Sequence, residues 1–308
     1  MYNVFIDGSA GTTGLKIVER LSDRKDIKLI TLPEEKRKDI LARKDALNSA
    51  DLAFLCLPDA AAIEAVSLIE NEKVKVIDTS TAHRVNPAWA YGFPELLGKR
   101  EIIKNSTRIA NPGCHASGFI ALISPLIEAG VMDKSVNLSC FSITGYTGGG
   151  KKMIAEYEGE EKPVLYNAPR QYGLGQTHKH LPEMQVVCNL ENKPLFCPIV
   201  ADYDRGMEVT VPLFKKDIKA SIDQIKEIYQ KAYTGKIVKF VDYSEEGFLS
   251  AMSMSGKDGM EVSVFGNDER ILLVSRFDNL GKGASGAAIQ NMNILLGVDE
   301  TSGLILGE

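Results

Sequence analysis

The first hundred residues alternate short apolar runs with amphipathic segments. Strands are predicted for the apolar runs at residues 2–7, 27–32, 52–57 and 74–78. Helices are predicted where apolar positions recur at helical spacing, at residues 15–21 and 60–69. The run at 52–57 is apolar throughout, which is typical of a central strand in a parallel sheet. This βαβαβ order predicts an α/β fold with a Rossmann-type, doubly wound parallel sheet.

The pattern changes after about residue 112. Longer alternating runs predict strands of a mixed or antiparallel sheet at residues 136–142, 195–202, 207–213, 260–265 and 271–277. Helices are expected after Cys114, near residues 218–233, and at 283–296, where a face of small residues permits close packing. Two glycine-rich stretches, 147–151 and 256–259, are expected to be loops.

The composition of the 308 residues excludes several classes of protein. A hydrophobic fraction of 44% and a charged fraction of 25% are ordinary globular values. A net charge of −5 argues against nucleic acid as a partner, because phosphate binding needs a basic face. The five cysteines form no CxxC pair, so we expect reduced thiols and no metal site. With no signal segment or membrane span evident, we expect a cytoplasmic protein that does not bind membranes.

The stretch Asn111-Pro112-Gly113-Cys114 places a thiol where a loop becomes an apolar helix. Asn111 is expected to cap that helix, and the positive helix N-terminus would stabilise a thiolate at Cys114. The alternative is a cysteine that only fills a core position. Together with a dinucleotide-binding loop, the thiol predicts an enzyme that passes an acyl group through a thioester.

That loop lies between the first strand and the first helix. Its sequence is G-x-x-G-x-x-G, with the cofactor-binding residues predicted to be Gly8, Gly11, Thr12, Thr13 and Gly14. Glycines there permit a tight turn and bring backbone N–H groups close to a pyrophosphate.

The second strand is followed by both acidic and basic residues. Because Lys36 and Arg37 suit an additional phosphate, we favour NADP over NAD, although an ordinary charged surface explains them nearly as well.

His178 and His180 are the candidate acid/base residues, since imidazole titrates near neutral pH. On a strand, two residues apart, they would project in opposite directions, so only one would reach the sulfur. His83 and His115 are interpreted as ordinary surface or core histidines, although His115, beside the thiol, remains a candidate.

Several polar residues are candidates for binding a substrate phosphate or carboxylate. The stretch from Gly145 to Lys152 combines a flexible backbone with two cations, among them Lys151; a glycine-rich hairpin turn is the alternative. Arg84 and Arg170 are expected to grip an anion through two hydrogen bonds.

With these motifs in place, the chain resembles the N-acetyl-gamma-glutamyl-phosphate reductase family in its shorter form, type 2, within the aspartate-semialdehyde dehydrogenase-like superfamily. The resemblance covers nearly the whole chain, and the stretches that carry it are residues 7–15, 54–59, 78–80, 91–96, 111–114, 145–152, 178–183 and 279–284. It implies an NADP-binding Rossmann domain at 1–112, completed by the C-terminal helix 283–308. The residues between them, 113–282, would form an α+β catalytic and oligomerisation domain with a mixed sheet.

The resemblance also implies roles for individual residues. Cys114 matches the nucleophile, and His178 or His180 the general acid/base. The cofactor site would extend to Pro58, Ser80 and Asn279. The substrate site would include Asn111, Gly145, Lys151, Arg84, Arg170 and Glu183. His115 stands where we associate a tyrosine with the family, a difference expected to affect packing more than reaction class.

The expected reaction is the reduction of N-acetyl-L-glutamyl 5-phosphate to the 5-semialdehyde by NADPH in arginine biosynthesis, with release of phosphate. The chain would act as a homo-oligomer, a dimer or a tetramer. Two other enzymes share this chemistry: aspartate-semialdehyde dehydrogenase and a carrier-bound aminoadipate-phosphate reductase. An alternative from another class is a regulator that senses NADP and catalyses nothing.

Overall fold

The computed structural model describes residues 1–243 and 247–307. The chain divides into two compact units. The first comprises residues 1–94, 98–112 and 284–304, and the second comprises 95–97, 113–283 and the segment that begins at 305.

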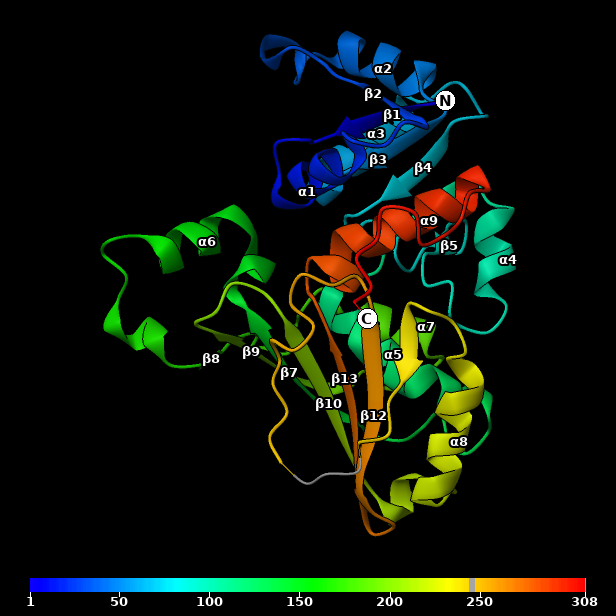
Figure 1. Cartoon of the computed structure of the whole chain (residues 1–308), viewed down its shortest axis with the longest axis vertical. Coiled ribbons are helices and arrows are strands. Elements are labelled where there is room, and N and C mark those ends of the chain that lie inside the picture. Colours follow the sequence, from blue (N-terminus) through cyan, green and yellow to red (C-terminus); the bar gives the residue numbers. More distant parts are fainter. Residues whose placement is uncertain (244–246, 308) are drawn as a thin grey trace. The chain divides into compact units, whose positions relative to one another are not determined.

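The first unit contains a six-stranded sheet whose strands are all parallel (Figure 1). Its strands are β1 (Tyr2–Asp7), β2 (Ile27–Ile30), β3 (Leu52–Leu55), β4 (Lys75–Asp78), β5 (Ala90–Tyr91) and β6 (Arg108–Ala110), in the order β2-β1-β3-β4-β6-β5. The chain moves outward from β1 to β2 and then returns to place β3 on the other side of β1. Adjacent crossovers therefore diverge between β1 and β3, which is where doubly wound sheets bind their ligands.

Helices cover both faces of this sheet. The helices of the unit are α1 (Thr12–Leu21), α2 (Ile40–Ser49), α3 (Asp59–Ser67), α4 (Lys99–Lys104) and α9 (Gly286–Leu296). One core joins the strands to α1, α4 and α9 through side chains that include Ile17, Ile103 and Met292. A second core joins the opposite face to α2 and α3 through Leu47, Ala62 and Ala65. The predicted doubly wound α/β fold is confirmed.

The second unit is built on a seven-stranded mixed sheet, as the alternating runs predicted. The strands are β7 (Ser139–Gly145), β8 (Arg170–Gln171), β9 (Leu195–Ala201), β10 (Met207–Phe214), β11 (Val238–Phe240), β12 (Met260–Asn267) and β13 (Arg270–Phe277). Their order is β11-β12-β13-β10-β7-β9-β8, in which β7–β9 and β11–β12 are the parallel pairs.

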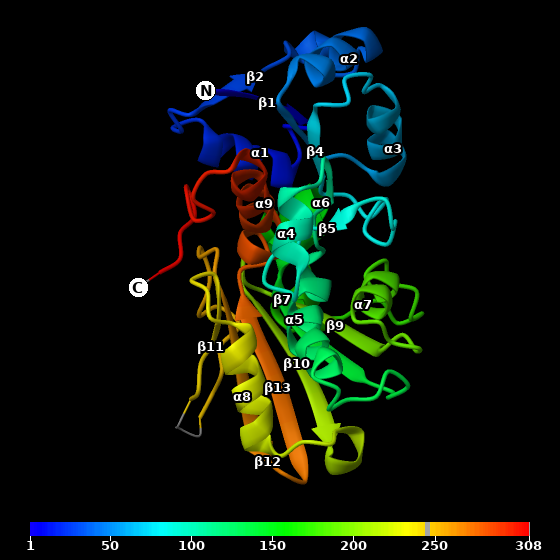
Figure 2. The same ribbon diagram turned by 90° about the vertical axis from the view of Figure 1, so that its right-hand side faces the viewer.

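The helices of the second unit are α5 (Cys114–Glu128), α6 (Gly150–Glu158), α7 (Leu181–Val187) and α8 (Ile222–Ala232). Helices α5 and α8 pack on one face of the sheet, against β10, β12 and β13 (Figure 2). The start of α8 differs from the predicted residue 218, because Ser221 caps the helix and forms a capping box with Gln224.

Two predictions of local structure are wrong. Residues 147–151, expected as a loop, are helical: a 3-10 turn at Tyr146–Gly149 leads directly into α6. The helix-forming residues that follow override the glycines, and the ring of Tyr146 stacks on that of Tyr157 with the ring centroids 4.9 Å apart. His178 and His180 lie in a turn before α7, not on a strand.

A buried ion pair holds two distant segments of the second unit together. Lys282 Nζ lies 2.9 and 2.8 Å from the two carboxylate oxygens of Glu95, and the two side chains are 1% and 6% exposed. Burial of either charge without its counter-ion is costly, so the pair fixes Glu95–Leu97 within this unit.

We expect Lys282→Met to lower the free energy of unfolding by about 3–5 kcal/mol, because the buried carboxylate of Glu95 loses its cation. Urea unfolding followed by circular dichroism measures the change. The control is Lys231→Met, which removes the cation of an exposed pair with Glu227 on α8. That variant should stay within about 0.5 kcal/mol of the wild type. Equal stability of the two variants would contradict the assigned role of Lys282.

Candidate active site

Cys114 is the first residue of α5 and is partly exposed. The helix is capped by Gly113, which has no side chain to accept from the first turn. The prediction that Asn111 caps the helix is wrong. Its side-chain N–H donates to the carbonyl of Ala284 (3.0 Å), and its side-chain oxygen accepts from Asn291 (3.2 Å). No side chain at the cap position therefore accepts a hydrogen bond from the first turn of α5.

A carboxylate from another helix takes the place of a local cap. Glu183, on α7, is 1% exposed, and its Oε1 accepts a hydrogen bond of 2.8 Å from the backbone N–H of Gly113. An acidic side chain is favourable at a helix N-terminus. Glu183, predicted as a substrate ligand, thus holds the residue directly before the nucleophile.

Three imidazoles gather around this end of α5. The ring centroids of His178 and His180 are 4.7 Å apart, and those of His115 and His180 are 5.6 Å apart. The prediction that His178 and His180 project in opposite directions is wrong, because a turn places both rings on the same side. The backbone N–H of His180 donates to Nδ1 of His178 (3.2 Å). In the neutral form of His178, the proton is therefore on Nε2.

His115 is surrounded by polar partners of its own. Its Nδ1 lies 2.7 Å from Ser142 Oγ, and its Nε2 lies 2.6 Å from the hydroxyl of Tyr172. Burial lowers the pKa of His115 to about 3, and the charge of His178 contributes in the same direction. His115 is consequently neutral at any pH near 7.

Tyr172 and Cys114 belong to the same electrostatic environment. Burial raises the pKa of the Tyr172 phenol, and the charge of Cys114 raises it further. Elsewhere, burial raises the pKa of Cys56 to about 12, and it also raises the pKa values of Cys140 and Cys188. Cys140 and Cys188 are buried and lack the exposure that Cys114 has.

A widened, π-helical turn at Gly281–Ser285 brings backbone against the nucleophile. A Cβ atom at Gly283 would lie 3.0 Å from the Cβ of Cys114. Only glycine fits this approach without moving the cysteine. Sequence reasoning included Gly283 in a helix but missed its contact, together with Tyr172 and Ser142, because residues so far apart in the chain carry no shared local signal.

The glycine loop of the first unit has the geometry of a phosphate cradle. Gly8 has a φ of +84°, and a Cβ atom there would lie 2.2 Å from the carbonyl oxygen of Cys56. At Gly14 the corresponding Cβ would lie 2.4 Å from the oxygen of Gly8. The chain then enters α1 at Thr12, with no acidic residue in the first turn. The backbone is therefore packed too closely for side chains at these two positions, and a tight glycine turn at a helix N-terminus fits a dinucleotide pyrophosphate.

The other predicted cofactor residues of this unit follow its parallel strands. Lys36 and Arg37 lie in an exposed 3-10 turn and its end, after β2, where Arg37 pairs with Glu34 at 3.5 Å. Pro58 caps α3 after β3. Ser80 follows β4, and its hydroxyl donates to Asp78 (2.7 Å).

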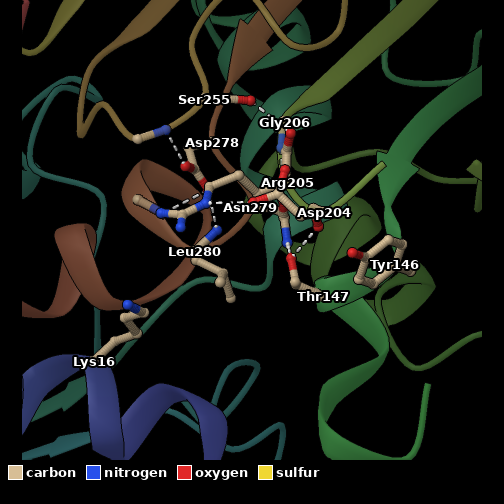
Figure 3. Close-up of polar contacts among 12 residues, drawn as sticks. Lys16, Tyr146, Thr147, Asp204, Arg205, Gly206, Ser255, Asp278, Asn279 and Leu280 are labelled. Carbon is tan, nitrogen blue, oxygen red and sulfur yellow. Dashed lines mark hydrogen bonds and ion pairs between the residues drawn. The ribbon is translucent and has the colours of Figure 1, made fainter. Parts of the chain in front are cut away.

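The predicted residues Gly145 and Asn279 both bind Gly206 in the second unit: the N–H of Gly145 donates to its carbonyl (3.1 Å), and the contacts of Asn279 are drawn in Figure 3. The side-chain oxygen of Asn279 accepts from the N–H of Gly206 (2.9 Å), and its amide donates to Thr147 Oγ1 (3.0 Å). A Cβ atom at Gly145 would lie 2.5 Å from the oxygen of Asp204. Asn279 thus links the turn at Tyr146–Gly149 to Gly206, the residue before β10, while Lys151 is exposed on α6.

The two candidate arginines are held by different partners. Arg84, in the first unit, donates to the carbonyls of Asn111 (2.9 Å) and Thr79 (3.0 Å). Arg170, in the second, donates twice to the hydroxyl of Tyr157, and its guanidinium carbon lies 3.3 Å from the ring centroid of Tyr166. An anion that binds Arg170 through these same N–H groups has to displace the phenol.

Among residues 1–243 and 247–307, no group of three or more His, Cys, Asp or Glu side chains is arranged to hold a metal ion. Within the same residues, no helix combines the length and the apolarity needed to cross a membrane.

Comparison with known proteins defines the class. The chain matches the semialdehyde dehydrogenase NAD binding domain over residues 3–106 and the semialdehyde dehydrogenase dimerisation domain over 114–279. Aspartate semialdehyde dehydrogenase II from Vibrio cholerae, solved in complex with ASA, has the same fold with a TM-score of 0.71 and 16% identity, covering 96% of this chain and 98% of that one. The Francisella tularensis aspartate semialdehyde dehydrogenase gives a TM-score of 0.72 and 14% identity over 96% and 100%.

Closer relatives narrow the class to one family. The N-acetyl-gamma-glutamyl-phosphate reductases of Brucella ovis and Brucella canis are each 46% identical to the chain over 305 residues, which is 96% of this chain and 98% of each relative. The chain belongs to the N-acetyl-gamma-glutamyl-phosphate reductase family. The predicted family, the fold and the class of oxidoreductase are confirmed, and so is a nicotinamide dinucleotide as the cofactor.

We expect Gly8→Ala to destabilise the first unit and to abolish cofactor binding, because the substitution combines a positive φ with a backbone overlap. Gly11→Ala is the matched change in the same loop: its φ is −73° and its nearest contact would be 3.4 Å away. Thermal unfolding with and without NADP should show a much larger loss for Gly8→Ala. Equal melting temperatures would contradict this reading of the loop.

Proposed function

We propose that the chain reduces N-acetyl-L-glutamyl 5-phosphate to N-acetyl-L-glutamate 5-semialdehyde and phosphate, in arginine biosynthesis, with NADPH as the reductant. The observation that carries the proposal is the placement of Cys114. It is a partly exposed thiol at a helix start, among His115, His178 and His180, in a chain whose 46% identical relatives bear this enzyme's name.

The first step is acyl transfer to Cys114. The thiolate attacks the acyl carbon, the C–S bond forms, and the bond to the phosphate oxygen breaks. The helix N-terminus of α5 stabilises the negative sulfur before attack. The backbone N–H of Cys114 is suited to receive the oxyanion that develops on the acyl oxygen.

The two histidines differ in what they can do. His180 accepts the thiol proton in this proposal, because the backbone N–H of His180 occupies the lone pair on Nδ1 of His178. His178 therefore presents a proton on Nε2 and acts as a hydrogen-bond donor to substrate. Glu183 positions the site through Gly113 rather than by touching substrate.

The second step is reduction of the thioester at the same carbon: a hydride adds to the carbonyl carbon, and the resulting thiohemiacetal then collapses. NADPH, when bound, supplies the hydride. The glycine loop at residues 8–14 is proposed to hold its pyrophosphate, Lys36 and Arg37 its additional phosphate, and Pro58, Ser80 and Asn279 the rest of its site. When the C–S bond breaks, the semialdehyde leaves and the thiol is regenerated. Arg84, Arg170 and Lys151 are proposed to bind the anionic groups of the substrate.

We expect Cys114→Ser to lose nearly all turnover and to retain NADP binding, because the hydroxyl is a poor nucleophile without activation. The assay follows NADPH formation from N-acetylglutamate semialdehyde, phosphate and NADP. His180→Gln should lower kcat about 10²–10⁴-fold. Turnover by Cys114→Ser at the wild-type rate would end the proposal.

The same assay separates the competing activities. A higher kcat/KM for aspartate semialdehyde would favour aspartate-semialdehyde dehydrogenase. The absence of turnover with either semialdehyde, together with NADP binding and no substrate protection of Cys114 from alkylation, would favour a regulator.

We propose further that the chain forms a homodimer through the uncovered face of the second sheet. Phe141, Leu195 and Leu272 are 44%, 54% and 43% exposed. Register places them on the face opposite α5, since Phe141 alternates with buried Cys140 and Ser142 on β7. An apolar sheet face of this kind, in a chain that matches a dimerisation domain, fits a second copy.

We expect Phe141→Asp to shift the protein from dimer to monomer in light scattering coupled to size-exclusion chromatography, because a charge in an apolar interface is desolvated. Leu41→Asp, at a 71% exposed position on α2, is the control and should leave the mass unchanged. A dimer in both variants would place the interface elsewhere.

A further inference from the structure

The π-helical turn that packs against the nucleophile begins from a buried aspartate that the proposed mechanism does not use. Asp278 follows β13 directly and is 1% exposed. Its backbone carbonyl accepts from the N–H of Gly281 (3.1 Å) and from the N–H of Gly283 (3.0 Å). The bond from Gly283 spans five residues, which is the spacing of a π-helix. The main chain of Asp278 therefore defines the width of the turn.

The side chain of Asp278 caps the same turn. Its Oδ1 accepts from the backbone N–H groups of Leu280 (2.7 Å) and Gly281 (3.3 Å), two and three residues further along the chain (Figure 3). Aspartate and asparagine cap helices with this pattern of bonds. Its Oδ2 accepts from the backbone N–H of Gly256 (2.6 Å), which belongs to a separate loop. The carboxylate thus joins the start of the turn to residues 255–257.

Residues 255–257 pack directly on the turn. A Cβ atom at Gly281 would lie 2.2 Å from the carbonyl oxygen of Lys257, so the two backbones are in contact there. The same loop is bonded on its other side, where Ser255 Oγ donates to the carbonyl of Arg205 (2.6 Å). The loop therefore supports the turn from a position that is itself fixed.

Gly283 connects this arrangement to the nucleophile. A Cβ atom at Gly283 would lie 3.0 Å from the Cβ of Cys114 and 3.1 Å from the carbonyl oxygen of Asp278. The glycine is therefore packed between the backbone of the aspartate and the side chain of the cysteine, and all three residues belong to the second unit. Because packing at this distance leaves no spare room, a displacement of the turn changes the space in which the Cys114 side chain can rotate.

We propose that Asp278 is a positioning residue for Cys114: it caps the turn at Gly281–Ser285, holds Gly283 against the cysteine and so restricts the orientation of the thiol. This inference rests on the proposed role of Cys114 as nucleophile. The buried Lys282–Glu95 pair holds the middle of the same turn through a different contact. Removal of the Asp278 carboxylate therefore loosens the turn without releasing it.

The first test is the rate at which iodoacetamide alkylates Cys114 in the full chain, followed by mass spectrometry of the peptide that contains Cys114. We expect Asp278→Ala to raise the rate several-fold, because a looser turn leaves the thiol more accessible. Asp278→Asn should raise it less. The asparagine oxygen can still cap the turn, but its side-chain N–H group faces the N–H of Gly256, where the wild type has an acceptor.

Asp217→Ala is the matched control. Asp217 also follows a strand of the second sheet, and its Oδ2 accepts from the backbone N–H of Phe214 (2.8 Å). It lies at the opposite end of the antiparallel β10–β13 pair from Asp278. The rate of Cys114 alkylation in this variant should equal that of the wild type.

Cys140 and Cys188 serve as internal controls in the same samples. Both are buried in the second unit, so they react only when that unit unfolds. We expect them to stay unmodified in Asp278→Ala while Cys114 reacts faster. A general loss of structure would expose all three thiols together.

The second readout is turnover in the reductase assay. We expect Asp278→Ala to lower kcat about tenfold with little change in KM, because the binding groups remain and the geometry of attack is lost. Asp278→Asn should recover part of that loss. Faster alkylation combined with slower turnover is the signature of a thiol that is accessible but poorly oriented.

Two results would overturn the inference: an unchanged rate of Cys114 alkylation in Asp278→Ala, or an equal rise in Asp217→Ala. If Cys140 and Cys188 also react in Asp278→Ala, then Asp278→Asn decides, and a wild-type rate in that variant is likewise contrary. Alkylation requires no acyl phosphate. A wild-type protein that fails to turn over the semialdehyde would therefore contradict the proposed function and leave the alkylation result standing.

Discussion

The carboxylate of Glu183 holds the start of α5, and the proposed chemistry depends on that start. Gly113 has no side chain with which to cap the helix, so the N–H group before Cys114 is bound by a residue from another helix. A local cap such as serine at position 113 would place a hydroxyl where the nucleophile needs open backbone donors. With the cap supplied from α7, the sulfur of Cys114 remains partly exposed.

Close backbone approach is the second constraint, and it acts in both units. Gly8 leaves no room for a side chain against Cys56, and Gly283 leaves little against Cys114. A Cβ atom would meet the backbone carbonyl of Cys56 in the first case and the side chain of the nucleophile in the second. Glycine is required at both positions because neighbouring atoms leave too little space for a side chain, not because the backbone has to be flexible there.

Much of the fold was predictable because a strand or helix that buries one face carries a periodic pattern of apolar residues in its sequence. The apolar run that contains β3 is buried along all of Leu52–Leu55, and the alternating runs became strands of the mixed sheet. Helix α2 was missed because its outward positions include Leu41, at 71% exposure, while Arg43 is buried against Asp7, so its hydrophobic face is not evident. The two-residue strands β5 and β8 are too short to carry any period.

The sequence by itself determined the class of fold, the glycine loop and the candidate thiol, since each depends on residues that are neighbours in the chain. Only the tertiary structure decided what surrounds that thiol. His178 and His180 share one side because a turn, not a strand, carries them, and Asn111 bonds to Ala284 and Asn291 instead of capping α5. Tyr172, Ser142 and Gly283 reach Cys114 or its neighbour from three separate elements. Contacts between residues so far apart follow from packing, which no local pattern of side chains records.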